Sequence, residues 1–401
     1  MRLGTSTLGV VVAMVFTANL AHAQVPANIE EGLKKIGQIV DPACTAKLYR
    51  PLMPKNDYNT YWPPDASAPA SPAQLYPGIT IARDTSFGPD AKDLVDIFTA
   101  DKGGDNRPVL IYVPGGAGNK IEQQAREGNA FYDNIGRWAT KNGMVGVLIQ
   151  RHPGSGNWDD GGRDISKAVD WLTDNVAKYK GDPKRMFIWA HSAGNGPLGV
   201  YIGHADRWPK GVAVKGAVFM SGNPVPGVGG GGGRGAGAPG AGRGPGGPGG
   251  APGGPQAGAA CGMTGTALGA EGAIAGPSSA RAGGAGGGRG AGGGRGGFGQ
   301  QLTPEQQAER DNLPGFKKTE VKIMLVRAEL DPGVTGDMAA SDKVLHDELC
   351  KLDGAKAKDG AGHCPAMLFA KGESHMSEVF SIDTDDKIVS APILAWMKKI
   401  K

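Results

Sequence analysis

The chain has 401 residues, which suits one large domain or two ordinary ones, and its composition is globular except for 69 glycines. Its formal net charge of +4 is small for this length, so the charge gives no reason to expect a nucleic-acid partner. The four cysteines form no C-x-x-C pair, which leaves a zinc site or a thioredoxin-type site without support.

The first residues have the pattern of a secretory signal peptide. Met1 and Arg2 supply a positive start, an apolar run extends from Leu8 to Thr17, and Ala21-His22-Ala23 is an A-x-A cleavage pattern. The run is too short to span a bilayer, so we expect a signal peptide at residues 1–23 and an exported protein, periplasmic or extracellular. An uncleaved anchor is the alternative. No later segment is apolar enough to cross a membrane, so we expect no stable membrane insertion.

Residues 24–76 form an N-terminal extension that is rich in Pro, Ala and Asp. Its one predicted helix is Ile29–Val40. The pattern does not choose between an extension that wraps the core and one that shapes a pocket.

From residue 77 onward the sequence alternates strands and helices. Gly78–Phe87 and Asp93–Thr99 are predicted as consecutive strands, because a Gly-Pro-Asp turn separates them. The remaining strands are continuous apolar runs: Pro108–Val113, Met144–Gln150, Arg185–Ala190, Val214–Met220, Val321–Arg327 and Ala366–Ala370. Helical spacing is found in Phe131–Lys141, Ile165–Val176, the segment after Ser192, Asp337–Leu352 and Asp386–Lys399. This alternation predicts an α/β fold with a mainly parallel sheet, antiparallel edge strands and helices on both faces.

A low-complexity block at residues 227–299 follows the sixth core strand and divides the domain into residues 77–226 and 300–401. The block holds 35 of the 69 glycines and almost no large apolar side chain. Burial therefore cannot offset the entropy of ordering it, and we expect a disordered insertion. It carries arginines without interleaved aromatic residues, so nucleic-acid binding is not expected there either.

The segment Ala190-His191-Ser192-Ala193-Gly194 follows an apolar strand directly and precedes a helix. A serine on a strained strand-to-helix turn, with small residues two positions away on each side, is typical of a nucleophile elbow. The N-terminus of the following helix favours negative charge at this point. The pattern predicts Ser192 as a nucleophile, with a helix N-cap serine as the alternative.

A glycine-rich loop, Pro114-Gly115-Gly116-Ala117-Gly118, ends another strand well before the serine. Backbone N–H groups in such a loop stabilise the negative charge that develops on a carbonyl oxygen during acyl transfer. We expect an oxyanion hole made of Gly116, Ala117 and Ala193, with an ordinary Gly-rich turn as the alternative.

A nucleophilic serine needs a base, and the base needs an acid to orient it. Asp331 lies just beyond the strand at 321–327, where a parallel sheet places functional loops, with Glu329 and Asp337 as alternatives. His375 is the only histidine at a strand end after Asp331, and His191 is expected to point away from the site.

Two further features are less specific. Trp158 offers an aromatic wall to an acyl or aryl group, or it is a packing residue. Cys350 and Cys364 flank a short polar loop, a spacing that suits a local disulfide in an oxidising compartment. Free thiols are the alternative, since four cysteines allow three pairings and the sequence does not choose among them.

Together these residues resemble the α/β-hydrolase carboxylesterases of the hormone-sensitive-lipase-like and feruloyl-esterase-like branch. Three stretches carry the resemblance: Asp93 through Ala117, Asp164 through Gly194, and Glu329-Leu-Asp-Pro with Ser374-His375. The chain departs from the family at Pro114, where the family has histidine.

The resemblance implies a serine esterase that hydrolyses a small-molecule ester through an acyl-enzyme, with a triad of Ser192, His375 and Asp331. It implies no metal and no organic cofactor. The alternatives are a peptidase or amidase of the same fold, a non-catalytic exported binding protein, and a surface interaction protein that acts through the Gly-rich block.

Overall fold

The computed structural model of the chain describes residues 25–53, 76–116, 130–152, 157–225, 303–332, 334 and 338–400. Several predicted features lie outside these residues: the signal peptide at 1–23, Ala117 of the glycine-rich loop, the alternative acid Asp337 and the Gly-rich block at 227–299.

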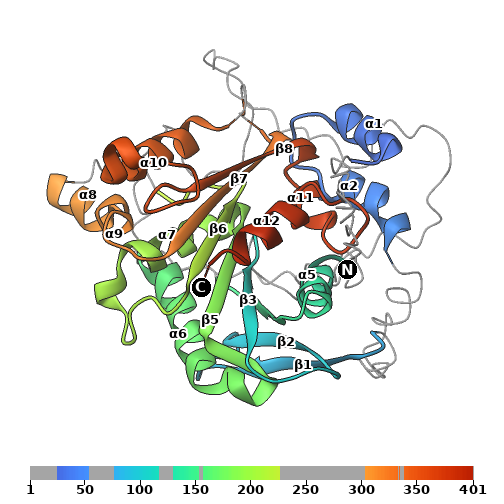
Figure 1. Cartoon of the computed structure of the whole chain (residues 1–401), viewed down its shortest axis with the longest axis horizontal. Helices are drawn as coiled ribbons and strands as arrows, with labels where there is room; N and C mark the ends of the chain where they lie inside the picture. The colour runs from blue at the N-terminus through green and yellow to red at the C-terminus, as the bar shows by residue number, and fades with distance from the viewer. Residues whose placement is uncertain are drawn as a thin grey trace, which may run out of the picture.

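Eight strands form one sheet in the order β1-β2-β4-β3-β5-β6-β7-β8 (Figure 1). They are β1 (Ile79–Ser86), β2 (Leu94–Ala100), β3 (Arg107–Val113), β4 (Val145–Ile149), β5 (Gly181–His191), β6 (Gly216–Met220), β7 (Lys322–Leu330) and β8 (Ala366–Ser374). Strand β2 pairs antiparallel with β1 and with β4, and the other pairs of this sheet are parallel. The predicted fold class is confirmed, including the antiparallel strands at one edge.

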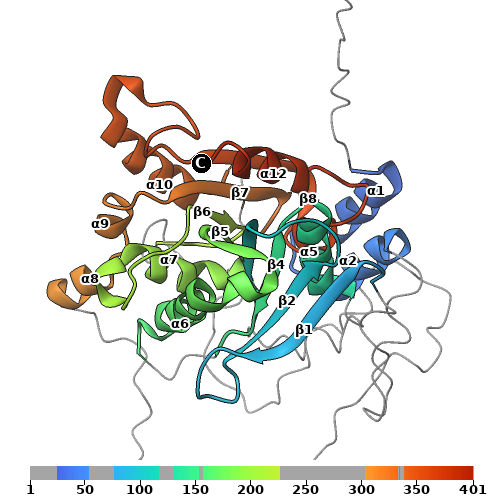
Figure 2. The same ribbon diagram turned by 60° about the horizontal axis from the view of Figure 1, so that its bottom comes forward.

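Helices cover both faces of the sheet (Figure 2). One face carries α1 (Ala27–Ile36), α2 (Pro42–Tyr49), α5 (Ala130–Lys141), α11 (Ser377–Phe380) and α12 (Ser390–Met397). The other carries α6 (Asp160–Asn175), α7 (Asn195–Gly203), α9 (Leu313–Phe316) and α10 (Ala340–Cys350). The short elements are α8 (Pro304–Arg310), η1 (Arg50–Leu52), η2 (Val176–Tyr179), η3 (Ser192–Gly194), η4 (Ala205–Arg207) and η5 (Lys351–Lys356).

Along each central strand, successive side chains point alternately into the hydrophobic layers on the two faces of the sheet. On β3, Leu110 and Tyr112 belong to the layer under α5, whereas Ile111 and Val113 belong to the layer under α6. Continuous apolar runs are therefore what this sheet requires, because both of its faces are buried.

The described part of the N-terminal extension contains two α-helices where one was predicted. Helix α2 begins at Pro42, and the carboxylate of Asp41 accepts a hydrogen bond from the backbone N–H of Cys44, as a capping residue does. Ile29 and Tyr49 are buried in the main hydrophobic layer, so the described part of the extension packs onto the core.

Strand β8 is longer than predicted, and its extra residues bring the end of the strand directly before His375. The apolar pattern predicts a strand that ends at Ala370, but β8 continues to Ser374 through Gly372, whose φ of 81° only glycine adopts readily. The predicted helices at 337–352 and 386–399 are correspondingly shorter, at 340–350 and 390–397. As a result, Asp331 and His375 each follow immediately after a parallel strand, at the same edge of the sheet.

None of the helices in the described part of the chain is both long and apolar enough to cross a membrane.

Candidate active site

Ser192 lies on a strained turn between β5 and α7. Its φ is +52°, in the left-handed region that residues other than glycine seldom adopt. The turn is crowded: a Cβ on Gly194 would lie 2.7 Å from the backbone oxygen of Val113, and one on Gly115 would lie 2.9 Å from the Cβ of Ser192. The small residues around the serine are therefore a steric requirement of the turn.

A continuous hydrogen-bonded chain links Ser192, His375 and Asp331. The hydroxyl oxygen of Ser192 lies 2.8 Å from Nε2 of His375, and Nδ1 of His375 lies 2.6 Å from Oδ1 of Asp331. The three residues follow β5, β8 and β7, so the sheet brings together positions up to 183 residues apart. The alternative acid Glu329 instead accepts a hydrogen bond from the backbone N–H of Gly372. A serine, an imidazole and a carboxylate in this order can transfer a proton from the serine as it attacks.

The second oxygen of Asp331 is bound by Arg327, a residue that the sequence analysis missed. Nη1 of Arg327 donates to Oδ2 of Asp331 over 2.6 Å, while its Nε and Nη2 donate to Asp342 over 2.8 and 2.9 Å. Burial alone would raise the pKa of Asp331, but its hydrogen bond to His375 and the Arg327 guanidinium outweigh burial and lower that pKa. Asp331 is therefore held ionised and in a fixed orientation.

His191 also contributes to the site. The prediction that its ring points away from the site is wrong, because its Nε2–H donates to the backbone carbonyl of His375 over 2.8 Å, and the two rings lie 4.8 Å apart. Burial, with the nearby His375, lowers the pKa of His191 to about 3, so the ring is neutral in ordinary buffers.

The glycine-rich loop after β3 is held by Arg151. Its Nε and Nη2 donate to the carbonyl oxygens of Pro114 and Gly116 over 2.7 and 2.6 Å. In a planar trans peptide the N–H points opposite to the carbonyl, so these bonds direct the N–H of Gly115 away from Arg151. Gly116 has a φ of +57°, and Ala193 is exposed directly after Ser192. The sequence predicted this loop but not the arginine that fixes it.

The described contacts of Trp158 are with residues outside the Ser192–His375–Asp331 chain. Its ring lies 4.8 Å from the ring of His204, and the Arg207 guanidinium lies 4.8 Å above it. Both partners line a cavity of about 510 Å³ whose lining includes none of the three residues of the Ser192–His375–Asp331 chain. A substrate contact of Trp158 stays a prediction.

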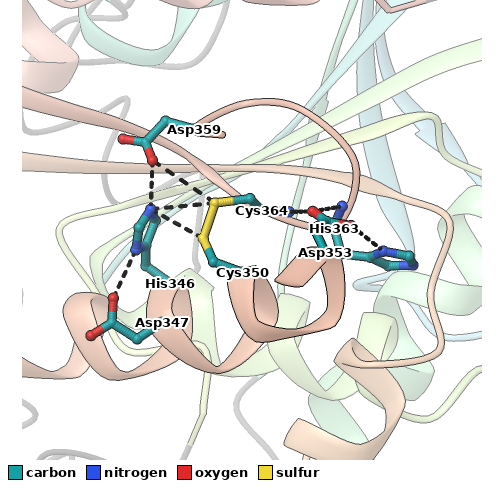
Figure 3. The surroundings of a disulfide bond; sticks show 7 residues. All are labelled: His346, Asp347, Cys350, Asp353, Asp359, His363 and Cys364. Atoms are coloured by element: carbon teal, nitrogen blue, oxygen red, sulfur yellow. Dashed lines mark hydrogen bonds and ion pairs between the residues drawn. A yellow bond between two sulfur atoms is a disulfide. The ribbon is translucent and has the colours of Figure 1, made fainter. Parts of the chain in front are cut away.

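Cys350 and Cys364 are joined by a disulfide bond (Figure 3). His346, one turn earlier on α10, lies beside both sulfur atoms, with Nε2 at 3.4 Å from one and 3.6 Å from the other. Cys44 is disulfide-bonded as well. The Cys350–Cys364 bond closes the connection from α10 to β8, the strand that leads to His375.

Comparisons with known proteins show similarity to a family model and to curated lipases over part of the chain. Residues 95–207 match the BD-FAE family model, which covers the glycine-rich loop and Ser192. The chain is 36% identical over 56 residues to Secreted lipase 5 of Gibberella zeae, a match that covers 14% of this chain and 10% of that protein. It is 24% identical over 132 residues to Lipase 2 of Geotrichum candidum, which covers 30% and 23% of the two chains. The chain thus spans less than a quarter of the length of these curated relatives.

Solved structures include two similar esterases. Esterase B from Lactobacillus rhamnosis has 10% identity and a TM-score of 0.46, with 81% of this chain and 88% of that chain covered. A truncated carbohydrate esterase from gut microbiota has 12% identity and a TM-score of 0.45, with 80% and 95% covered. The strand order and the turn at Ser192 give the chain an α/β-hydrolase fold, and residues 95–207 are similar to the BD-FAE family model.

Proposed function

We propose that this protein is a serine carboxylesterase that hydrolyses small-molecule carboxylic esters through an acyl-enzyme. The observation that carries the proposal is the hydrogen-bonded chain from Ser192 through His375 to Asp331. The BD-FAE match and the lipases among the relatives support an ester as the substrate class.

In the proposed reaction, the hydroxyl oxygen of Ser192 attacks the acyl carbon while Nε2 of His375 accepts its proton. Asp331, ionised and held by Arg327, stabilises the imidazolium that forms. The backbone N–H groups of Gly116, Ala117 and Ala193 stabilise the oxyanion. His375 then returns the proton to the leaving alcohol, and water releases the acid by the reverse sequence of proton transfers.

We also propose that the protein acts outside the cytoplasm. The Cys350–Cys364 disulfide supports this, because disulfides persist in oxidising compartments. N-terminal sequencing of the protein from a periplasmic or culture-medium fraction should give Gln24 as the first residue. Recovery only from the cytoplasm, with Met1 retained, would contradict export.

A fluorophosphonate probe tests the proposed nucleophile directly, because it reacts covalently with activated serines. We expect labelling in the peptide that contains Ser192, and loss of labelling when excess p-nitrophenyl butyrate competes. A folded protein that does not label would favour a non-catalytic binding protein.

A substrate panel separates the esterase from a peptidase or amidase. We expect p-nitrophenyl acetate and butyrate to be hydrolysed with a kcat/KM well above that for the matched p-nitroanilides. Faster cleavage of aminoacyl p-nitroanilides would assign the same site to an amidase.

A further inference from the structure

Three polar side chains from separate segments converge next to Arg151. Asp93 lies just before β2, His152 follows β4, and Asp164 is in α6. One ligand atom from each side chain lies within 4.8 Å of the other two. Because β2 and β4 are neighbours in the sheet, the topology brings Asp93 and His152 to the same corner of the molecule.

Each carboxylate uses one of its oxygens to hold the backbone. Oδ2 of Asp93 accepts from the N–H of Asp90, and Oδ2 of Asp164 accepts from the N–H of His152, both over 3.0 Å. The other oxygen of each is buried, together with Nε2 of His152, and among the described residues none of these three atoms has a hydrogen-bond partner.

The distances between the three atoms do not describe hydrogen bonds. Nε2 of His152 lies 3.2 Å from Oδ1 of Asp93 and 3.8 Å from Oδ1 of Asp164. The first contact is short enough for a hydrogen bond but is misaligned, and the second is too long. The side chain of Asp93 is fully buried and that of Asp164 is only 8% exposed, so water offers these oxygens little compensation.

We propose that Asp93, His152 and Asp164 form a binding site for a divalent transition metal, with Zn²⁺ as the preferred ion. Zinc binds imidazole nitrogen and carboxylate oxygen at about 2.0–2.2 Å, so two of its ligand atoms in tetrahedral geometry lie about 3.4 Å apart. The observed 3.2 and 3.8 Å bracket this separation. Magnesium and calcium prefer all-oxygen sites, which disfavours them at a site with an imidazole.

The charges around the site suit a bound dication. Asp93 and Asp164 supply two negative charges, and Asp90 adds a third acid near His152. Lys167 and Arg151 are the cations that interact with Asp164. Zinc keeps a fourth position for solvent in sites with three protein ligands, and the side chain of His152 is the most exposed of the three, at 21%.

The site is structural and does not depend on the proposed esterase function. Its effect on the rest of the molecule runs through Arg151, which precedes His152 and holds the carbonyls of Pro114 and Gly116. A cation that fixes the backbone at His152 therefore also fixes the anchor of the glycine-rich loop.

Direct binding of Zn²⁺ to the full chain tests the proposal. The protein is treated with dipicolinate, freed of the chelator and titrated with ZnCl₂ against a chromophoric competitor, and its melting midpoint is followed in parallel. We expect one Zn²⁺ per chain and a rise of several degrees in the midpoint. His152→Gln, at the most exposed ligand, and Asp164→Asn should each weaken binding at least tenfold.

Asp359→Asn is the matched control, because it removes a carboxylate beside His346 in the other cluster of potential ligands. It should leave stoichiometry and affinity unchanged. Unchanged affinity in His152→Gln and Asp164→Asn, or no saturable binding by the parent protein, would overturn the proposal and make the cluster an ion-pair network. Zinc-edge absorption of the parent protein gives a check without variants: nitrogen and oxygen ligands support the site, and sulfur ligands contradict it.

Discussion

The imidazole of His191 donates a hydrogen bond to the backbone carbonyl of His375, with 2.8 Å between Nε2 and the carbonyl oxygen. The two residues are 184 positions apart in the sequence. The residue before Ser192, the proposed nucleophile, thereby positions the backbone of the residue proposed to be the base. Because the carbonyl can only accept, Nε2 carries the proton.

Replacing His191 should lower activity without removing a reacting group. In His191→Leu the donor is lost, and a displacement of His375 of about 1 Å would reduce kcat about 100-fold. His191→Gln retains a donor and should recover part of the rate. Steady-state kinetics on p-nitrophenyl butyrate measures both, and a kcat for His191→Leu equal to that of the parent protein would refute the positioning role.

His191 should also make the protein less stable in acid. Its pKa is about 3 in the folded state, below the ordinary value of 6.5, so between these values the unfolded chain binds a proton that the folded chain does not. Stability from this group is complete above pH 6.5 and is lost toward pH 3, at up to about 1.4 kcal/mol per pH unit. Urea unfolding from pH 4 to 7 should give a shallower dependence in His191→Gln. An equal pH dependence of stability in His191→Gln and the parent protein would show that a group other than His191 causes the loss of stability in acid.

Glu373 should have the opposite pH dependence. It is fully buried, and burial with the nearby Asp386 holds its pKa well above the usual value, so the folded protein keeps this carboxyl protonated. As pH rises above about 4.5 the unfolded chain ionises, and stability falls. Glu373→Gln imitates the neutral acid and can still accept from the Ser377 hydroxyl. We expect the free energy of unfolding at pH 8 to rise by about 1 kcal/mol or more, with a smaller gain at pH 5. A loss of stability at both pH values would contradict a neutral Glu373.

The crowding at the nucleophile turn can be tested with two glycines two positions apart. A Cβ on Gly194 would lie 2.7 Å from the backbone oxygen of Val113 and 2.9 Å from that of Pro114, atoms that cannot move independently. Gly194→Ala should therefore cost about 1–3 kcal/mol and most of the activity. Gly196→Ala is the control, because in the described part of the chain the added Cβ has no neighbour within 4 Å apart from its chain neighbours and the backbone of its own helix. This variant should stabilise α7 by about 0.5–1 kcal/mol. Equal melting midpoints for the two variants would contradict this description of the turn.

Arg327 is expected to matter for both stability and pH dependence. Arg327→Met leaves Asp331 and Asp342 buried without their cation, at a cost of about 3–5 kcal/mol. Without the guanidinium the pKa of Asp331 rises, so the acid limb of the kcat/KM profile should move to higher pH. Arg327→Lys keeps the charge and should move the limb less. An acid limb of the kcat/KM profile at the same pH in Arg327→Met and the parent protein would show that Arg327 does not lower the pKa of Asp331.

Those parts of the site that depend on short, local sequence patterns could be predicted from the sequence. The strand and turn around Ser192, and the presence of a strand before Asp331 and another before His375, are properties of short segments, although β8 ends at Ser374 and not at the predicted Ala370. The contacts of Arg151 with Pro114 and of His191 with His375 were not predicted, because they depend on how strands and helices far apart in the sequence assemble around the sheet. The convergence of Asp93, His152 and Asp164 was missed for the same reason. Helix α2 was missed although its signals, Asp41 and Pro42, are local.

The rate of p-nitrophenyl acetate hydrolysis by Ser192→Ala is the sharpest test of Ser192 as the nucleophile, with an unchanged melting midpoint as the check on folding. We expect kcat/KM to fall by a factor on the order of 10⁴ or more, because removal of the proposed nucleophile leaves only binding and oxyanion stabilisation. A folded Ser192→Ala protein that hydrolyses this ester at the rate of the parent protein would contradict it.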